Sequence, residues 1–209
     1  LAAGIGKRMQ PLTLKTHKSL LKINKKSLLD RAFNLLIDNG IEEISINVHH
    51  LGDQIKKFIE EKNYKIKISI SDEKDNLLDT GGGILKGTNQ LNENEPFIVI
   101  NPDTLWGKNY NQDLKNLIKL YSKEKKPCML VVNKVFSFDK SFKGDFTLLG
   151  HVISKEKKNQ YIYTGLQIIN RKVFSKVNKK VFSMNIIWNE LIKKENLLGL
   201  QSTLPFYHL

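Results

Sequence analysis

The 209-residue chain contains very little cysteine and no long apolar run. Its single cysteine, Cys128, excludes an internal disulfide and any metal site built on a Cys-x-x-Cys pair. No stretch reaches the roughly 20 consecutive apolar residues that a transmembrane helix needs, and no secretory leader is recognisable. We therefore expect no membrane partner and a cytoplasmic location, where a lone thiol stays reduced.

Two common nucleotide-binding motifs are also missing. No GxxxxGK[ST] string occurs, which argues against a P-loop NTPase. The opening string "GIGKRM" has Met9 where a dinucleotide-binding fingerprint needs a third small residue. The acidic residue expected about 20 positions later, at the end of a second strand, is absent as well. A Rossmann dehydrogenase is therefore disfavoured.

Acidic residues are scarce relative to basic ones. The chain has 21 Asp and Glu against 34 Lys and Arg, a formal charge of +13. This surplus suits polyanionic partners, from nucleotides to nucleic acids. An abundance of Lys, Asn and Ile explains the same surplus without any function, and no aromatic stripe interleaves with the basic residues. We expect no nucleic-acid partner.

Helix and strand patterns alternate along most of the chain. Apolar residues at helical spacing predict a helix over 28–37, with Ser27 as its N-cap. The same reasoning predicts helices over 51–62, 111–126 and 184–195, strands over 42–48, 64–71, 96–101, 127–135 and 197–203, and a loop entering a helix over 80–91. This alternation is typical of a three-layer α/β domain with a mixed, mainly parallel sheet.

Short strand-like segments follow closely on one another at 144–149, 150–154 and 161–170. They predict a small antiparallel extension of the sheet. In open α/β sheets ligands bind beyond the carboxyl ends of the strands. Three loops should therefore meet there, namely the opening glycine turn, "DTGGGI" and "NPDTLW".

The opening string "LAAGIGKRMQPLT" resembles the signature LAAGxGxRMxPLT of the sugar-1-phosphate nucleotidylyltransferases. Further similar strings follow in that family's order: "THKSLLKINKKSLLDRAFNLLIDNGIEEISIN", "LLDTGGGI", "VINPDTLW", "KGDFTL" and "YIYTGLQIINRKVF". The last two resemble the branch of the N-acetylmuramate-1-phosphate uridylyltransferases, with the mannose-1-phosphate guanylyltransferases nearby. The resemblance spans almost the whole chain and implies a three-layer, Rossmann-like nucleotidyltransferase fold.

The resemblance also implies a reaction. An oxygen of a sugar 1-phosphate attacks the α-phosphorus of a nucleoside triphosphate in line, and pyrophosphate leaves; positioning and charge neutralisation carry the catalysis. The implied partners are UTP and N-acetylmuramic acid 1-phosphate, with Mg²⁺ as cofactor. Residues 1–209 would form one domain with a nucleotide-binding part (1–135) and a sugar-binding part (136–209). The oligomeric state is left open.

The resemblance implies that several residues bind the nucleotide. Arg8 should pair with phosphate oxygens, and Lys18 should reach the α-phosphate. Lys18 lies in "THKS" where the family has "TPKP", so His17 and Ser19 replace two prolines that stiffen the loop. Gly81 and Gly82 are expected to let the backbone lie against the base. The implied nucleotide-binding residues are Leu1, Ala2, Ala3, Gly4, Gly6, Leu78, Thr80, Gly81 and Gly82.

Asp103 is the candidate metal ligand and the third implied catalytic residue. It follows an apolar strand, where one carboxylate can hold Mg²⁺ between phosphate oxygens. Pro102 stands where the family has glycine. The family's late carboxylate ligand aligns with His208, which suits Mg²⁺ poorly because this ion prefers oxygen. Three alternatives follow: another acidic residue serves as the second metal ligand, one metal ion suffices, or the activity of this protein is impaired.

The implied sugar-binding residues are Asn47, Gly144, Asp145, Thr164 and Gly165. Thr164 and Gly165 would offer a hydroxyl and an amide to the sugar phosphate. An ordinary hairpin turn explains Gly144 and Asp145 almost equally well.

Two alternatives stay open beside the uridylyltransferase. The same loops would serve GTP and mannose 1-phosphate, because only the base contacts differ. The second alternative is a catalytically weak homologue that binds a nucleotide sugar. It is motivated by the departures from the family pattern at Ser19, Pro102 and His208.

Overall fold

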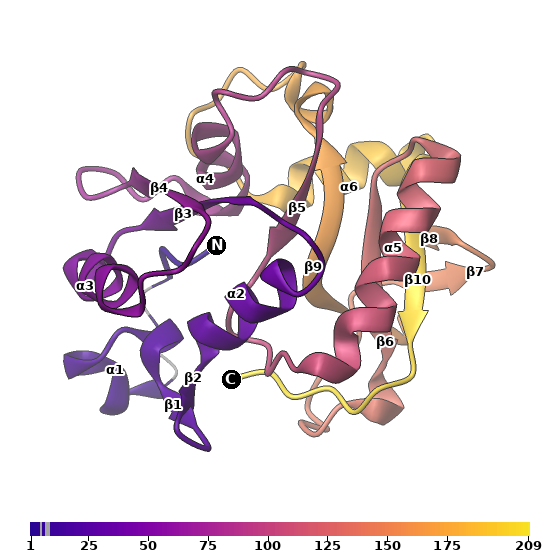
Figure 1. Ribbon diagram of the computed structural model, residues 1–209. Coiled ribbons are helices and arrows are strands. Elements are labelled where there is room, and N and C mark those ends of the chain that lie inside the picture. The colour runs from indigo at the N-terminus through magenta and orange to yellow at the C-terminus, as the bar shows by residue number, and fades with distance from the viewer. Residues whose placement is uncertain (5, 7–8) are drawn as a thin grey trace.

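The computed structural model describes residues 1–4, 6 and 9–209 (Figure 1). Its α-helices are α1 (Leu12–Lys15), α2 (Leu28–Ile37), α3 (Gly52–Lys62), α4 (Asp79–Gly87), α5 (Asn111–Glu124) and α6 (Met184–Lys193). Its strands are β1 (Lys22–Ile23), β2 (Lys26–Ser27), β3 (Glu43–Val48), β4 (Lys67–Asp72), β5 (Pro96–Ile100), β6 (Cys128–Asn133), β7 (Thr147–Leu149), β8 (Val152–Ser154), β9 (Tyr161–Asn170) and β10 (Leu198–Ser202). Single 3₁₀ turns are η2 (Lys18–Leu20), η3 (Lys108–Tyr110), η4 (Lys134–Phe136) and η5 (Arg171–Phe174).

A six-stranded sheet with helices on both faces forms the centre of the molecule. The strands lie in the order β5-β9-β6-β10-β8-β7. Side chains alternate along β6: Cys128 and Leu130 pack into the core that includes α5, whereas Met129 and Val131 pack into the one bordered by α6. Figure 1 shows α5 in front of this sheet. The three-layer α/β architecture is therefore confirmed.

Strand pairing differs from the sequence expectation in one respect. The sheet is mixed, as expected, but among the described strands of the six-stranded sheet only β6 and β10 pair in parallel. The cause is β9, which enters between β5 and β6 and runs antiparallel to both. Because the alternation of helices and strands shows only which elements are neighbours along the chain, it does not reveal such an insertion. The antiparallel β7–β8 extension does form.

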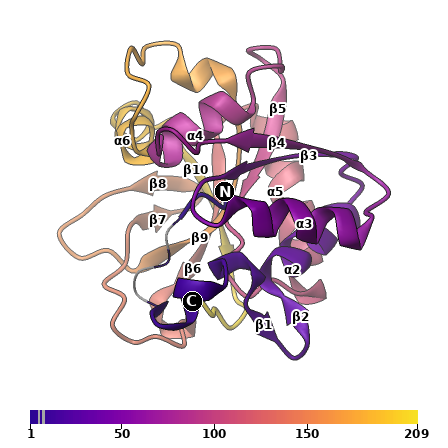
Figure 2. The ribbon, with the colours of Figure 1, turned by 90° about the vertical axis from the view of Figure 1, so that its left-hand side faces the viewer.

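The parallel pair β3–β4 lies apart from the large sheet, and the first residues of the chain lie between the two (Figure 2). The backbone nitrogen of Leu1 donates to the Ile100 carbonyl of β5 at 2.6 Å, and that of Ala2 donates to Asn47 Oδ1 of β3 at 2.8 Å. The opening turn therefore begins where the carboxyl ends of β3 and β5 approach each other.

Helix α4 begins earlier than expected, so the glycines of "DTGGGI" are helical and not part of a loop. A Cβ on Gly81 would lie 2.3 Å from the Phe182 ring, and one on Gly82 would lie 2.3 Å from the Lys180 carbonyl oxygen. The amides of both glycines donate to the Phe182 carbonyl. Close packing against 180–182 thus explains why these positions need glycine.

In the described part of the chain, no helix is both long and apolar enough to cross a membrane.

Replacing Gly82 with alanine should lower the free energy of unfolding by about 1–3 kcal/mol, because the new methyl group meets backbone that has no room to move. The matched control is Gly87→Ala in the same helix. Its nearest neighbour is the Ser45 hydroxyl at 3.2 Å, so a change below about 1 kcal/mol is expected. Urea unfolding measures both; equal losses would refute the packing role of Gly82.

Candidate active site

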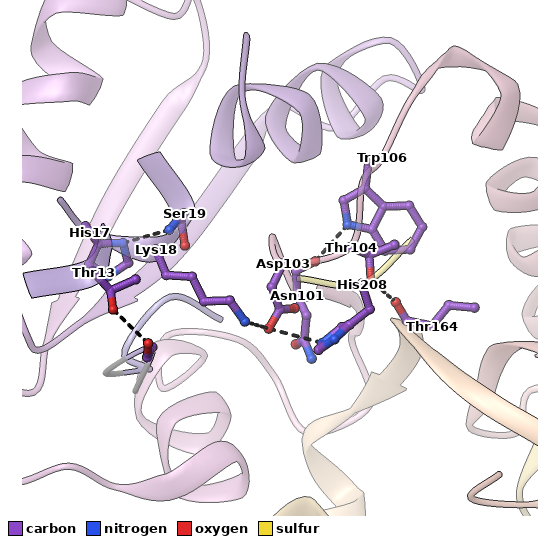
Figure 3. Close-up of polar contacts among 11 residues, drawn as sticks. Thr13, His17, Lys18, Ser19, Asn101, Asp103, Thr104, Trp106, Thr164 and His208 are labelled. Carbon is purple, nitrogen blue, oxygen red and sulfur yellow. Dashed lines mark hydrogen bonds and ion pairs between the residues drawn. The ribbon is translucent and has the colours of Figure 1, made fainter. Parts of the chain in front are cut away.

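The carboxylate of Asp103 brings together three segments that are far apart in the sequence (Figure 3). Lys18 Nζ lies 3.0 Å from Asp103 Oδ2, and His208 Nε2 lies 3.4 Å from the same oxygen. The side chains of Lys18 and Asp103 are only 13% and 25% exposed. A carboxylate that contacts an ammonium group and an imidazole, with little water around it, is suited to binding charged groups.

Lys18 is held by a hydrogen-bonded loop. The ring of His17 is buried, with Nε2 at 2.8 Å from the Ala2 carbonyl and Nδ1 accepting from the Ser19 amide at 3.1 Å. The His17 amide donates to Gln54 Oε1 of α3 at 2.8 Å. These bonds require a neutral imidazole protonated at Nε2, and burial lowers the pKa of His17. Hydrogen bonds therefore stiffen this loop where the family uses prolines.

The loop after β5 fixes Asp103. Trp106 is fully buried, and its Nε1 donates to the Asn101 carbonyl at 2.7 Å. Thr104, also buried, donates to the Thr164 carbonyl of β9 at 2.6 Å. Asp103 is thus anchored on both sides at the carboxyl end of β5, where α/β sheets place their ligands.

His208 reaches Asp103 because the end of the chain is paired with the same loop. The Leu105 amide donates to the Tyr207 carbonyl at 2.9 Å, and the Leu209 amide donates to the Asp103 carbonyl at 3.0 Å. The imidazole also packs against the rings of Phe142 and Phe206. This backbone pairing gives His208 a defined position beside the carboxylate.

The charge state of Asp103 follows from these neighbours. Burial by itself would raise its pKa, but the contact with His208 and the charge of Lys18 outweigh burial and hold the pKa well below its usual range. Asp103 is therefore an anion at neutral pH. Its Oδ1 is buried and has no hydrogen-bond partner among the described residues, so one oxygen is left for a cation.

A cavity of about 280 Å³ opens beside Asp103 and His208. Among its lining residues, Asn101 Oδ1 and Tyr163 Oη are buried and, within the described chain, lack a hydrogen-bond partner. Burial and the charge of Asp103 raise the pKa of Tyr163, so its hydroxyl keeps its proton. Unpaired buried polar groups are costly unless a ligand or water satisfies them, which marks this cavity as a binding site. Sequence reasoning missed Asn101, Tyr163 and the lining residue Lys155, because only the folded chain shows their environment.

Comparison with known proteins places this site in a family. The family model described as "Nucleotidyl transferase" matches residues 1–135. The chain belongs to this family.

Its curated relatives share modest identity. The N-acetylmuramate alpha-1-phosphate uridylyltransferase of Caulobacter vibrioides is 27% identical over 207 residues, which are 95% of this chain and 85% of that protein. The enzyme of the same name from Neisseria meningitidis is 35% identical over 150 residues, 71% of this chain and 63% of that protein. The D-glycero-alpha-D-manno-heptose 1-phosphate guanylyltransferase of Campylobacter jejuni is 31% identical, covering 84% of this chain and 76% of that protein.

Solved structures agree on the fold. HddC from Yersinia pseudotuberculosis, in a complex with GMP-PN, superposes with a TM-score of 0.77 at 21% identity and covers 99% of this chain and 90% of that one. A putative glucose-1-phosphate thymidylyltransferase from Bacillus anthracis gives 0.79 at 19% identity, covering 99% and 87%. The curated relatives are named as sugar-1-phosphate uridylyl- and guanylyltransferases, and this nucleotidyl transferase is an enzyme of that class.

The opening turn of this nucleotidyl transferase presents open backbone at Gly4. A Cβ there would meet nothing within 4 Å, whereas Ala2 and Ala3 are buried beneath it. Gly6 has a positive φ of 67°, and its carbonyl accepts from Thr13 Oγ1 at 2.8 Å. Arg8, expected to contact phosphate, lies outside the described residues, and its role stays a prediction.

The residues expected to contact the base are partly occupied by the protein itself. Gly81 and Gly82 are buried against 180–182, and Thr80 Oγ1 accepts from the Met184 amide at 2.9 Å. The triple glycine suggested a backbone that lies open for a base, whereas the structure packs the backbone of these glycines against residues 180–182. Leu78 is half-buried and Thr80 is exposed. Base contact at this helix start stays a prediction.

The expected sugar-side residues divide into two groups. Asp145, Thr164 and Gly165 line the 280 Å³ cavity. The Thr164 hydroxyl donates its proton to the Leu130 carbonyl. The expected contact of this hydroxyl with the sugar phosphate stays a prediction. Gly165 has a φ of 92° and packs on Asn101, where a Cβ would lie 2.8 Å from Asn101 Cβ. Gly144, with a φ of 88°, shapes the turn before Asp145.

Asn47, also expected at the sugar, is not among the residues that line this cavity. Its Oδ1 accepts from the Ala2 amide, and its Nδ2 donates to Glu73 Oε1 at 2.8 Å. Glu73 Oε2 accepts in turn from the Leu78 amide at 2.9 Å. This buried network connects the opening turn to the start of α4, so Asn47 fixes the backbone of the opening turn.

A larger, mostly apolar cavity of about 450 Å³ lies between β3 and β5. Neither Lys18 nor Asp103 lines it. It therefore does not compete with the smaller cavity as the site of phosphate chemistry.

The His17 loop leads to a prediction about pH and stability. Because burial lowers its pKa, His17 takes up a proton more readily in the unfolded chain than in the folded one. Its contribution to stability is thus complete above the ordinary value of 6.5 and is lost as pH falls through the folded pKa.

His17→Asn keeps an acceptor for the Ser19 amide but removes the bond to Ala2 and the titrating ring. We expect it to lower the free energy of unfolding at pH 8 by about 1 kcal/mol, and His17→Ala to lower it by about 1–3 kcal/mol. Below pH 6.5 the wild type should lose stability more steeply than His17→Asn. Parallel pH profiles from urea unfolding would show that the ring does not act through its protonation state.

Proposed function

We propose that this nucleotidyl transferase transfers UMP from UTP to N-acetylmuramic acid 1-phosphate, releasing pyrophosphate. The observation that supports the proposal is the Lys18–Asp103 ion pair at 3.0 Å, because Asp103 also lines the 280 Å³ cavity. The finer choice of UTP and of the sugar is supported by the relatives from Caulobacter vibrioides and Neisseria meningitidis, which share that name.

The proposal gives each part of the site a role. Open backbone at Gly4 receives the triphosphate, and the ammonium of Lys18 balances charge that develops on the transferred phosphate. The unpaired oxygens of Asn101 and Tyr163 orient the sugar in the cavity. Asp103, through its unpaired oxygen, would hold a divalent cation that would neutralise phosphate charge; the sequence predicts Mg²⁺. No covalent intermediate is needed, and Cys128, whose pKa burial raises to about 12, is inert.

The proposal places residues 1–135 at the nucleotide and residues 136–209 at the sugar, within one domain. It also includes a cytoplasmic location and a role in peptidoglycan recycling, both as the sequence predicts.

Pyrophosphate release tests the proposal directly. UTP, GTP, CTP and dTTP are each paired with the 1-phosphates of N-acetylmuramic acid, N-acetylglucosamine, glucose and mannose. We expect the fastest release with UTP and N-acetylmuramic acid 1-phosphate. Fastest release with GTP would favour a guanylyltransferase, as the Campylobacter jejuni relative is named. Nucleotide binding without release from any pair would indicate the catalytically weak homologue.

Asp103→Asn should lower turnover at least about 100-fold, because it removes the anion that contacts both Lys18 and His208. Asp38→Asn, at an exposed position at the end of α2, is the comparison for the loss of a negative charge elsewhere. Turnover near the wild-type value in the Asp103 variant would remove this carboxylate from the mechanism.

Lys18→Ala should lower kcat by about 10²–10³-fold while changing nucleotide affinity much less, because the ammonium acts most strongly on charge formed in the transition state. Lys15→Ala, three residues away and exposed, should retain wild-type kinetics. Steady-state kinetics with a separate measurement of nucleotide binding distinguish the two effects. An equal loss of kcat and of affinity would assign Lys18 to binding alone.

A further inference from the structure

The second protein group beside the Asp103 carboxylate is an imidazole. His208 Nε2 lies 3.4 Å from Asp103 Oδ2, and the described residues hold no cluster of three or more His, Cys, Asp or Glu side chains that would add an acid here. A cation on Asp103 would therefore find one carboxylate and one nitrogen donor from this chain. Phosphate oxygens and water would have to complete its ligands.

This donor pair does not fit Mg²⁺. Mg²⁺ takes oxygen ligands almost exclusively and keeps several waters, whereas imidazole suits the first-row transition metals. The two groups are also close enough to contact one ion, because His208 Nε2 lies 3.4 Å from the nearer oxygen of this carboxylate.

Two further features favour a ligand role for His208. Pairing of the chain end with the loop after β5 holds the residue in place, so little ordering is required on binding. Lys18 occupies only Oδ2 of the carboxylate, and Oδ1 has no partner in the part of the chain that is described. The carboxylate thus has an oxygen available for a metal while Lys18 keeps its own contact.

We propose that Asp103 and His208 together bind a divalent first-row transition-metal ion, of which Mn²⁺ is the type, in preference to Mg²⁺. The inference rests on the proposed function, because that function places phosphate oxygens next to this pair. It assigns His208 as a metal ligand that changes the preferred ion, and not as a defect in the site.

Metal binding to the full chain tests this directly. Mn²⁺ is titrated in the presence of a non-hydrolysable UTP analogue, and the free-ion EPR signal gives the bound fraction while Mg²⁺ is added as competitor. Pulsed EPR then detects nitrogen coupling from a bound imidazole. We expect nitrogen coupling in the wild type and at least ~10-fold weaker competition by Mg²⁺ than in His208→Asp. His151→Gln, which changes an exposed histidine elsewhere, should match the wild type.

Two results would overturn the inference. One is bound Mn²⁺ without nitrogen coupling; the other is an unchanged preference for Mn²⁺ over Mg²⁺ in His208→Asp. Either would mean that His208 only contacts the Asp103 carboxylate and does not bind the metal. If His208→Asp does not fold, as circular dichroism would show, ¹⁵N-histidine labelling of the wild type decides alone, because the coupling must change with the isotope.

Failure of the proposed function gives a different pattern. If no substrate pair releases pyrophosphate but nitrogen-coupled Mn²⁺ is still bound, the proposed activity is refuted and the metal site is supported. Turnover with Mg²⁺, together with the same preference between Mn²⁺ and Mg²⁺ in the wild type and in His208→Asp, would support the activity and refute this inference.

Discussion

A single partly buried carboxylate organises this site. Asp103 carries its negative charge into a region with little water, which is tolerable only because Lys18 and His208 approach the same oxygen. Each of the three residues belongs to a different segment, and each segment is fixed by backbone or buried hydrogen bonds of its own. The loop of Lys18, the loop after β5 and the end of the chain are therefore held together around one charge.

Two histidines stand where the resemblance implies other residues. Where the family signature has a proline, His17 uses both ring nitrogens and its amide to fix the segment before Lys18. Where the resemblance implies a late carboxylate, His208 reaches Asp103 through pairing of the chain end with residues 103–105. Hydrogen bonds thus give both segments a defined position. The departures at Ser19 and His208, which motivate the alternative of a weak enzyme, are therefore accompanied by specific contacts.

Much of the fold could be predicted because its causes are local. Ser27 caps the start of helix α2 as expected, since its hydroxyl accepts a hydrogen bond from the Asp30 amide three residues later. Strand β6 was recognisable from its apolar run, because it is covered by helices on both faces. The resemblance implied that both Lys18 and Asp103 act at the phosphates, and the two side chains do lie together. The insertion of β9 between β5 and β6 could not be predicted, because no local pattern records which distant strand becomes a neighbour.

The sequence by itself determined the elements, the family and the residues that carry charge at the site. Periodicity, capping and motif spacing act over a few residues, so they can be read along the chain. Only the tertiary structure decided that Asn47 supports backbone and does not line the 280 Å³ cavity, and that Gly81 and Gly82 pack too closely on residues 180–182 to carry side chains. It also decided that Asn101 and Tyr163 hold polar atoms beside Asp103 that lack a partner among the described residues. Each of these facts depends on contacts between residues far apart in sequence, and burial and partner identity exist only once those contacts have formed.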